Sequence, residues 1–160
     1  MHFYFVGIKG TGMSALANIL VDLGYKVSGV DYNKKYFTEA TFNQSIVVES
    51  FDNYHLDEKY FYIIGNAFKL ADITEEIKEL GYHFEYYPSF LENFFKMKKI
   101  GVSGSHGKTT TTSFAHQLIK EDINVLIGDG TGIGYKDARY FLFEACEYQT
   151  AGDWWLLRDA

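Results

Sequence analysis

The sequence predicts an α/β fold built from two successive units, each with a mainly parallel sheet. Three observations predict it. Short apolar and aromatic runs alternate with amphipathic segments of helical period along the 160 residues. Two of these runs end in glycine-rich turns, at residues 7–12 and 104–107, that lead directly into helical segments. The apolar runs show little polar alternation, as expected of strands covered on both faces.

The first unit begins with strand, glycine turn, helix and strand. An aromatic strand is predicted over residues 2–7, and a helix over 10–23, where apolar side chains recur every three or four positions. Gly24 suits the end of this helix, since glycine readily adopts the left-handed conformation found there. A second strand follows at 26–30. This order is a βαβ unit, so the first unit, residues 1–97, is predicted to be a Rossmann-like parallel sheet domain.

The remaining elements of this unit are predicted at residues 60–64 (strand), 73–80 (helix), 83–87 (strand) and 90–97 (helix). Gly81 is expected to end the first of these helices, and Pro88 to end the second strand. Ser89 and Glu92 have capping-box spacing, which predicts that the last helix begins after Ser89.

The pattern restarts near residue 98, and residues 98–149 form the second predicted unit. Its elements are predicted at residues 100–103, 124–127 and 140–145 (strands) and 109–120 (helix), with a glycine-rich loop at 128–134. The last strand is expected to leave an open sheet edge, which favours self-association. Residues 150–160, which contain Trp154 and Trp155, do not continue the α/β alternation.

Composition excludes several classes of function. The formal net charge is −6 and no basic cluster is present, so a nucleic-acid surface is not expected. The single cysteine, Cys146, excludes an intramolecular disulfide and provides no zinc-binding spacing. No signal peptide or membrane-spanning run is recognisable, and a reducing, cytoplasmic location is predicted.

Residues 104–110, Gly-Ser-His-Gly-Lys-Thr-Thr, have the features of a phosphate-binding loop. The N-terminus of the following helix presents free N–H groups, and glycines let the backbone wrap around an anion. Lys108 can reach the β- and γ-phosphates of ATP, and Thr109 or Thr110 can offer a hydroxyl to Mg²⁺. The predicted ATP-binding residues are Gly104, Ser105, His106, Gly107, Lys108, Thr109 and Thr110, with Lys108 as the catalytic candidate.

Val102 stands where the general P-loop motif has its first glycine, so this loop is a shortened variant. A chance Gly-Lys-Thr at a helix start is the alternative interpretation. The preceding strand and following helix favour the loop, and the second unit is therefore predicted to be the start of a P-loop ATPase α/β domain.

Glu144 lies at the end of the last predicted strand and is a candidate Mg²⁺ ligand beside Thr109 and Thr110. Mg²⁺ prefers a few carboxylate or hydroxyl oxygens together with waters and phosphate. An ordinary surface carboxylate is the alternative.

The first glycine turn, residues 7–12, has the order G-x-x-G-x-G in place of the dinucleotide fingerprint G-x-G-x-x-G. It still provides a tight turn and a helix N-terminus that can face a pyrophosphate. Asp31 ends the next strand, where a ribose-binding acid is expected. The pattern favours a nucleotide diphosphate over NAD, with a purely structural turn as the alternative.

With two phosphate loops in tandem, the sequence resembles the Mur ligases, whose loop typically has the form His-Gly-Lys-Thr-Thr. The resemblance covers residues 2–149. The matching stretches are 5–14, 24–31, 65–68, 101–112, 126–132 and 143–148.

The resemblance implies a cytoplasmic, ATP-dependent ligase that acts on UDP-N-acetylmuramate and L-alanine through an acyl phosphate, in peptidoglycan precursor synthesis. Gly10, Thr11, Gly12 and Met13 would then face the UDP pyrophosphate, with Asp31 on the uridine side and Asn66 near the same nucleotide. ATP and Mg²⁺ would bind at the second loop, with Thr109, Thr110 and Glu144 as metal ligands.

Members of that family are more than twice as long as this chain, which predicts an N-terminal fragment limited to nucleotide binding. A non-catalytic module that binds UDP-sugars or ATP stays open as an alternative. The glycine order and Lys108 argue against a third possibility, a small NAD-dependent oxidoreductase.

Overall fold

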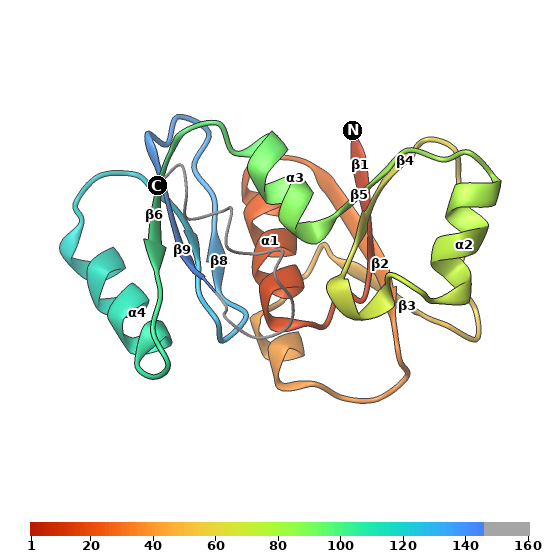
Figure 1. Cartoon of the computed structure of the whole chain (residues 1–160), viewed down its shortest axis with the longest axis horizontal. Coiled ribbons are helices and arrows are strands. Elements are labelled where there is room, and N and C mark those ends of the chain that lie inside the picture. Colours follow the sequence, from red (N-terminus) through yellow and green to blue (C-terminus); the bar gives the residue numbers. More distant parts are fainter. Residues whose placement is uncertain (146–160) are drawn as a thin grey trace.

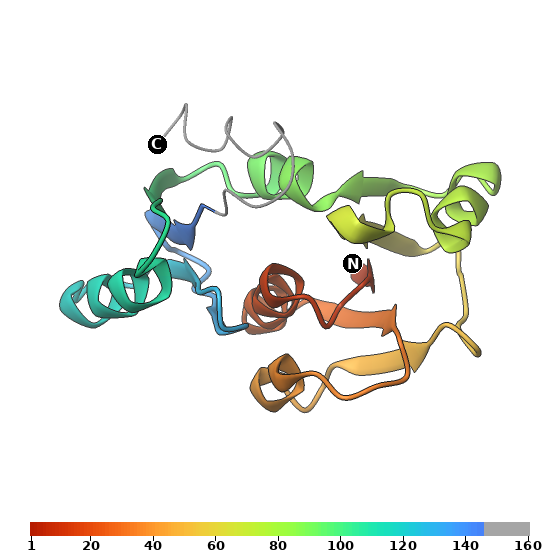
Figure 2. The same ribbon diagram turned by 60° about the horizontal axis from the view of Figure 1, so that its bottom comes forward.

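The computed structural model describes residues 1–145, in which two sheets lie on either side of one helix, α1 (Figures 1 and 2). In chain order the elements are β1 (His2–Val6), α1 (Thr11–Asp22), β2 (Lys26–Asp31), η1 (Phe37–Thr41), β3 (Val47–Ser50), β4 (Tyr60–Ile64), η2 (Asn66–Phe68), α2 (Asp72–Glu79), β5 (Phe84–Tyr86), α3 (Tyr87–Phe94), β6 (Lys98–Val102), α4 (Lys108–Leu118), β7 (Asn124–Leu126), β8 (Gly132–Ile133) and β9 (Tyr140–Glu144). Cys146 and the predicted segment 150–160 lie outside the described residues.

The first sheet has the strand order β3-β2-β1-β4-β5, and all its strands are parallel. Alternate residues of β1 face opposite sides: Phe3 and Phe5 pack with α1, whereas Tyr4 packs with α2. The prediction of a parallel Rossmann-like sheet covered on both faces is therefore confirmed. Successive strands are added on one side of β1 up to β3 and on the other side from β4 onward, and ligands bind at such a switch point in open α/β sheets.

The second sheet has the order β6-β9-β7-β8, and only the β7–β8 pair is antiparallel. β9 pairs with β6 along one side and with β7 along the other. The prediction that strand 140–145 forms an open edge is therefore wrong. After β8 the chain crosses back and places β9 between β6 and β7. Within residues 1–145 the edge strands of this sheet are therefore β6 and β8.

Two glycines end helices as predicted. Gly24 has φ +91° and Gly81 has φ +68°. In the first case Tyr25 N–H donates to the Leu20 carbonyl at 3.0 Å and Gly24 N–H to the Val21 carbonyl at 2.9 Å. This is the Schellman arrangement, which satisfies the last carbonyls of the helix.

The predicted capping box at Ser89 and Glu92 is wrong. Helix α3 starts at Tyr87 and ends at Phe94, so Ser89 already lies in its first turn. Pro88 occupies the beginning of this helix, where a missing N–H breaks no helical hydrogen bond. The proline therefore starts the helix as well as ending the strand.

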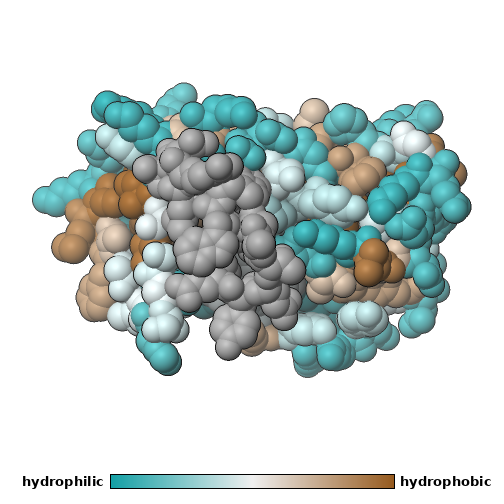
Figure 3. Space-filling model, in the orientation of Figure 1, coloured by the Kyte–Doolittle hydropathy of each residue, from teal (hydrophilic) through white to brown (hydrophobic). Residues whose placement is uncertain are grey.

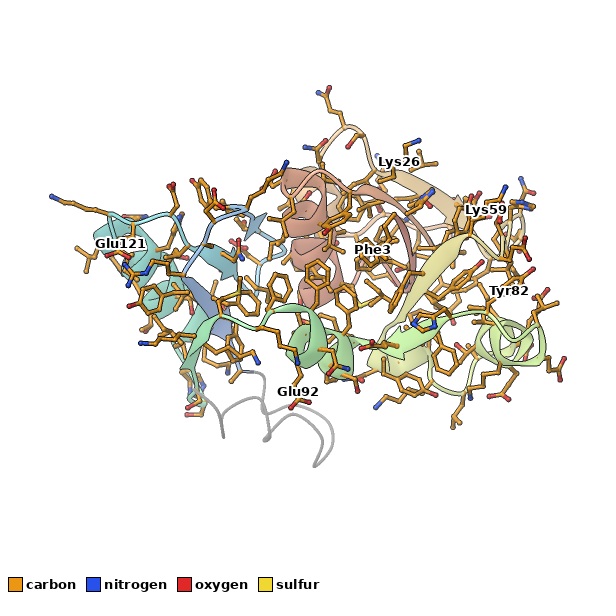
Figure 4. All side chains as sticks on the ribbon, turned by 90° about the horizontal axis from the view of Figure 1, so that it is seen from above. Phe3, Lys26, Lys59, Tyr82, Glu92 and Glu121 are labelled. Carbon is orange, nitrogen blue, oxygen red and sulfur yellow. The ribbon has the colours of Figure 1, made fainter. Side chains whose placement is uncertain are left out.

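An apolar core runs from the first sheet into the second. Phe3, Leu16, Leu126 and Phe143 belong to one buried cluster. Figure 4 shows Phe3 among aromatic side chains near the middle of the molecule, far from Glu121 at the α4 end. The predicted division at residue 97 stays a prediction, since the two sheets share this core.

Helix α4 lies at one end of the molecule with an apolar outer face. Phe114 and Leu118 are 60% and 77% exposed, and apolar side chains gather at this end in Figure 3. None of the helices in residues 1–145 is long and apolar enough to cross a membrane.

Three tyrosines in and beside the first sheet make the free energy of unfolding depend on pH in the alkaline range. Burial and a hydrogen bond to Glu49 raise the pKa of Tyr4 well above its usual range, and burial also raises the pKa of Tyr62. A hydrogen bond to Glu76 raises the pKa of Tyr54 to about 12. In the unfolded chain a tyrosine titrates near pH ~10, so above that pH the unfolded state releases these protons first. The stability contributed by the raised pKa values is therefore complete below pH ~10 and is lost as pH rises further.

Replacing Tyr4 by Phe is expected to make the alkaline loss of stability shallower by about 1.4 kcal/mol per pH unit above pH ~10, because one fewer proton is released on unfolding. Urea unfolding at several pH values above and below pH ~10 measures this slope. Tyr135→Phe, at a tyrosine that is 39% exposed, serves as the control. An unchanged slope in Tyr4→Phe would contradict the assignment.

Candidate functional site

A cleft of about 470 Å³ opens between the two sheets and is lined by residues from both. Its lining residues are Gly7, Gly10, Thr11, Gly12, Met13, Asp31, Tyr32, Tyr36, Gly65, Asn66, Ala67, Phe68, Tyr87, Leu91, Leu126, Gly128, Phe143 and Glu144. Every residue predicted to bind the sugar nucleotide lines this cleft, and so does the predicted metal ligand Glu144. The fold thus brings together side chains that are far apart in the sequence.

The first glycine turn joins β1 to α1 by a tight path that leaves no room for a side chain at Gly7. Gly7 has φ +86°, and a Cβ there would lie 2.3 Å from the ring of Phe68, so only glycine fits. Gly10 is the N-cap of α1 and offers no side chain to the helix N–H groups. These donors and the positive end of the helix dipole therefore face the cleft, where they suit an anion.

Asp31 holds this turn in place. One carboxylate oxygen accepts the Lys9 N–H and the other accepts the Tyr32 N–H, both at 2.8 Å. The Lys9 ammonium forms an ion pair with Glu39 at 3.1 Å. Asp31 still lines the cleft, and a carboxylate has lone pairs for further donors. It can therefore shape the loop and accept a ligand hydroxyl at the same time.

Asn66 has an amide oxygen that is buried and accepts no hydrogen bond in this structure. It begins η2, immediately after Gly65, whose N–H donates to the Val6 carbonyl at 3.0 Å. A buried acceptor left unpaired costs about 1–3 kcal/mol, so such groups concentrate where a ligand supplies the donor. Asn66 is thus suited to bind a polar group in the cleft.

The second glycine turn joins β6 to α4. Gly104 has φ +147° and Gly107 has φ +76°, and no atom lies within 4 Å of a Cβ built at Gly107. Gly107 is the N-cap of α4, again without a capping side chain. The Lys108 ammonium donates to the Gly104 carbonyl at 2.6 Å, which places its charge within the turn. Ser105 and His106 are exposed.

Glu144, at the end of β9, lines the cleft and links it to Thr109 in the first turn of α4. The Thr109 hydroxyl donates to Glu144 Oε2 at 3.2 Å, and the Gly128 N–H donates to Glu144 Oε1 at 2.7 Å. Thr109 and Thr110 both line a separate groove beside Phe114, and of the two only Thr109 also has a hydrogen bond to Glu144. Thr109 is therefore the threonine placed next to the carboxylate.

These oxygens fit Mg²⁺, which prefers hard ligands and keeps waters and phosphate oxygens in its shell. No group of three or more His, Cys, Asp or Glu side chains within residues 1–145 could hold a metal ion. A site of one carboxylate and one hydroxyl, completed by phosphate and water, matches this preference.

Several residues that line the cleft had not been predicted. The aromatic side chains of Tyr32, Tyr36, Phe68 and Tyr87 line it, in addition to residues of the first glycine turn. In a chain with 18% aromatic residues, aromatic type alone did not separate cleft residues from core residues. The available signal was position, since Tyr32 directly follows Asp31 at the end of β2.

A family profile described as "Mur ligase family, catalytic domain" matches residues 2–99, which is more than half of the chain. The chain belongs to the Mur ligase family. The match covers the whole first sheet and ends at the start of β6, before the second glycine turn. The resemblance inferred from the sequence is thus confirmed.

Curated relatives of this Mur ligase chain are UDP-N-acetylmuramate–L-alanine ligases. That of Streptococcus agalactiae serotype Ia is 44% identical over 154 residues, which cover 92% of this chain and 34% of the relative. That of Streptococcus thermophilus strain LMD-9 is 45% identical, covering 92% of this chain and 35% of the relative. The chain therefore spans about a third of the length of the curated relatives it matches.

Solved structures of Mur ligases share the fold. UDP-N-acetylmuramate:L-alanyl-gamma-D-glutamyl-meso-diaminopimelate ligase from Neisseria meningitides has a TM-score of 0.72 at 30% identity, covering 93% of this chain and 53% of that one. UDP-N-acetylmuramate-alanine ligase from Thermotoga maritima has a TM-score of 0.70 at 21% identity, covering 91% of this chain and 37% of that one. The second likeness shows the fold alone.

Proposed function

We propose that this chain binds the UDP end of UDP-N-acetylmuramate in the cleft and ATP with Mg²⁺ at residues 104–110. It does so as part of an ATP-dependent ligase that joins L-alanine to the sugar nucleotide for peptidoglycan precursor synthesis in the cytoplasm. The observation that carries the proposal is the cleft, which is lined both by the turn residues Gly10 to Met13 and by Glu144 beside Thr109. The names of the curated relatives supply the two substrates.

The pyrophosphate is assigned to the N-terminus of α1. There the uncapped N–H groups after Gly10 supply hydrogen bonds, and the helix dipole adds favourable electrostatic energy. Asp31 is assigned to the uridine side because it ends β2, beyond the glycine turn that it holds. The unpaired amide oxygen of Asn66 accepts a donor from the same nucleotide.

Bound MgATP would supply the γ-phosphoryl group that converts the lactyl carboxylate of the sugar into an acyl phosphate, with ADP as the leaving group. The amine of L-alanine would then attack the acyl carbon and displace phosphate. Lys108 balances negative charge on the phosphates, since its ammonium already lies within the turn. Thr109 and Glu144 hold the cation. The Gly128 N–H fixes the direction of the Glu144 carboxylate.

The two sites are neighbours, since Glu144 lines the cleft and accepts the Thr109 hydroxyl, and this serves the proposed reaction. Two reactants held in the right geometry react as if in a single molecule, which removes much of the entropic barrier. The apolar side chains of Leu91, Leu126 and Phe143 in the cleft wall disfavour water, which would hydrolyse an acyl phosphate. Neighbouring sites for the sugar nucleotide and ATP are what phosphoryl transfer to a carboxylate requires in the proposed ligase.

Calorimetric titration with UDP-N-acetylmuramate tests the proposal. Saturable binding is expected for the unmodified chain. Asn66→Ala is expected to bind about fivefold more weakly, because a hydrogen bond worth about 1 kcal/mol is lost. Asn93→Ala is the matched control, since Asn93 is exposed on α3 and its amide donates to Glu85. No heat with the unmodified chain at millimolar ligand would rule out the assignment of the cleft.

A further inference from the structure

The glycine segment, Gly128–Gly134, packs against helix α1. Glycine stands at every second position of this segment, at 128, 130, 132 and 134. Gly132 and Gly134 lie in extended chain and so share the face that meets α1, whereas residues 128–130 form a turn. The sequence suggested a glycine-rich loop here, but residues 132–133 form strand β8, which lies beside α1 in Figures 1 and 2.

A side chain at any of these positions would collide with a neighbour. A Cβ at Gly132 would lie 1.8 Å from the Ala15 carbonyl oxygen, and one at Gly134 would lie 2.5 Å from the Ile19 carbonyl oxygen. Ala15 and Ile19 are one turn apart on α1, so the segment follows the helix axis. Because both collisions are with backbone, neither can be relieved by rotating a side chain.

Hydrogen bonds also join the glycine segment to α1 and to η1. The Gly134 N–H donates to Asp22 Oδ2 at 3.0 Å, and the Thr41 hydroxyl donates to the Gly130 carbonyl at 3.1 Å. Gly130 has φ +94°, which favours glycine independently of the contacts. The shared apolar core, in which Leu126 packs with Leu16 and Leu20, continues beneath these contacts.

Helix α1 and the glycine segment each begin at the cleft. Helix α1 begins at the turn assigned to the pyrophosphate, and the glycine segment begins at Gly128, whose N–H holds Glu144. We propose that packing of the glycine segment on α1 sets the distance between the sugar-nucleotide site and the metal-ATP site, with Gly132 as the key positioning residue. The proposal rests on the function proposed above. It adds that the spacing of the two sites is built into one rigid unit.

Nuclear relaxation measures this spacing directly. Mn²⁺ accepts the same oxygen ligands as Mg²⁺, so Mn²⁺·ATP places a paramagnetic probe at the second site. It is expected to accelerate relaxation of the lactyl methyl protons of bound UDP-N-acetylmuramate in the unmodified chain. In Gly132→Ala this enhancement should be lost, because dipolar relaxation falls steeply with distance, while each ligand alone binds with unchanged affinity. A role limited to fold stability would not produce this result.

Two further variants cover the case in which Gly132→Ala does not fold and control for the loss of a glycine. Asp22→Ala removes only the hydrogen bond to Gly134 from an exposed position, so it folds even if Gly132→Ala does not, and it should reduce the enhancement in part. Gly81→Ala is the matched glycine control: it strains a left-handed residue that has no atom within 4 Å of the new Cβ and should keep the enhancement. Full enhancement in both Gly132→Ala and Asp22→Ala would overturn the proposal.

Failure of the proposed function gives a different result, namely that the unmodified chain binds neither ligand. Thermal unfolding then tests the rigid unit without ligands. One cooperative transition is expected for the unmodified chain and for Gly81→Ala, and two separated transitions for Gly132→Ala. Two transitions in the unmodified chain, or one in a folded Gly132→Ala, would overturn the proposal.

Discussion

Replacing Gly10 by Asp is expected to abolish UDP-N-acetylmuramate binding while the chain stays folded. Gly10 is the N-cap of α1, with φ −61° and ψ 146°, and the nearest atom to an added Cβ lies at 3.5 Å. Aspartate is a preferred N-cap residue, so the helix is stabilised or unchanged. Its carboxylate occupies the N–H groups assigned to the pyrophosphate and repels that anion. A like-charge contact costs several kcal/mol, which weakens binding at least ~100-fold.

Gly10→Asn separates charge from size. Asparagine has the shape of aspartate and is equally good as an N-cap, but it carries no charge. Calorimetry should therefore show a much smaller loss for Gly10→Asn than for Gly10→Asp, with equal melting temperatures for the two variants. Similar affinities in both variants would mean that the pyrophosphate does not bind at the N-terminus of α1.

Replacing Lys108 by Ala is expected to weaken MgATP binding about 10- to 100-fold, because hydrogen bonds to charged groups contribute about 1.5–3 kcal/mol. The Lys108 ammonium lies within the turn, where it donates to the Gly104 carbonyl, and no other lysine lies in residues 100–119. Titration with MgATP measures the loss. Binding of UDP-N-acetylmuramate should be unchanged, since the cleft is lined by other residues.

Lys120→Ala is the matched control for this variant. Lys120 is exposed just beyond the other end of α4, so its removal changes net charge equally without touching the glycine turn. Lys108→Arg adds a second comparison, because a planar guanidinium does not replace a compact ammonium at such a site. Equal losses in Lys108→Ala and Lys120→Ala would show that the effect is general electrostatics and that Lys108 has no specific role.

Local signals in the sequence correctly predicted the strand-turn-helix units and the ends of α1 and α2, whereas the helices predicted to end at residues 97 and 120 end at Phe94 and Leu118. Gly24 and Gly81 end helices because left-handed backbone is required directly after the last turn. The start of α3 was predicted three residues late, since Ser89 has capping-box spacing but Pro88 is equally suited to a first turn. Strand β3 was not predicted, because Val47-Val48-Glu49-Ser50 has only two apolar residues.

Pairing between strands that are distant in the sequence could not be predicted from such local signals. Nothing within residues 140–145 distinguishes an edge strand from an interior one, because the neighbours of β9 come from residues that are distant in the sequence. The role of the glycine segment was missed for a related reason. Its spacing of two residues was visible, but the surface that requires glycine is the backbone of α1.

The sequence by itself determined that the chain carries two glycine turns suited to phosphates and that it resembles the Mur ligases. These conclusions were accessible because glycine conformation, helix starts and motif spacing are local properties. Only the tertiary structure decided that Thr109 lies beside Glu144, that Asn66 lines the cleft and has a buried, unpaired amide oxygen, and that the glycine segment packs on α1. Each of these depends on contacts between distant positions, such as Gly134 with Asp22, 112 residues apart, which form only when the whole chain folds.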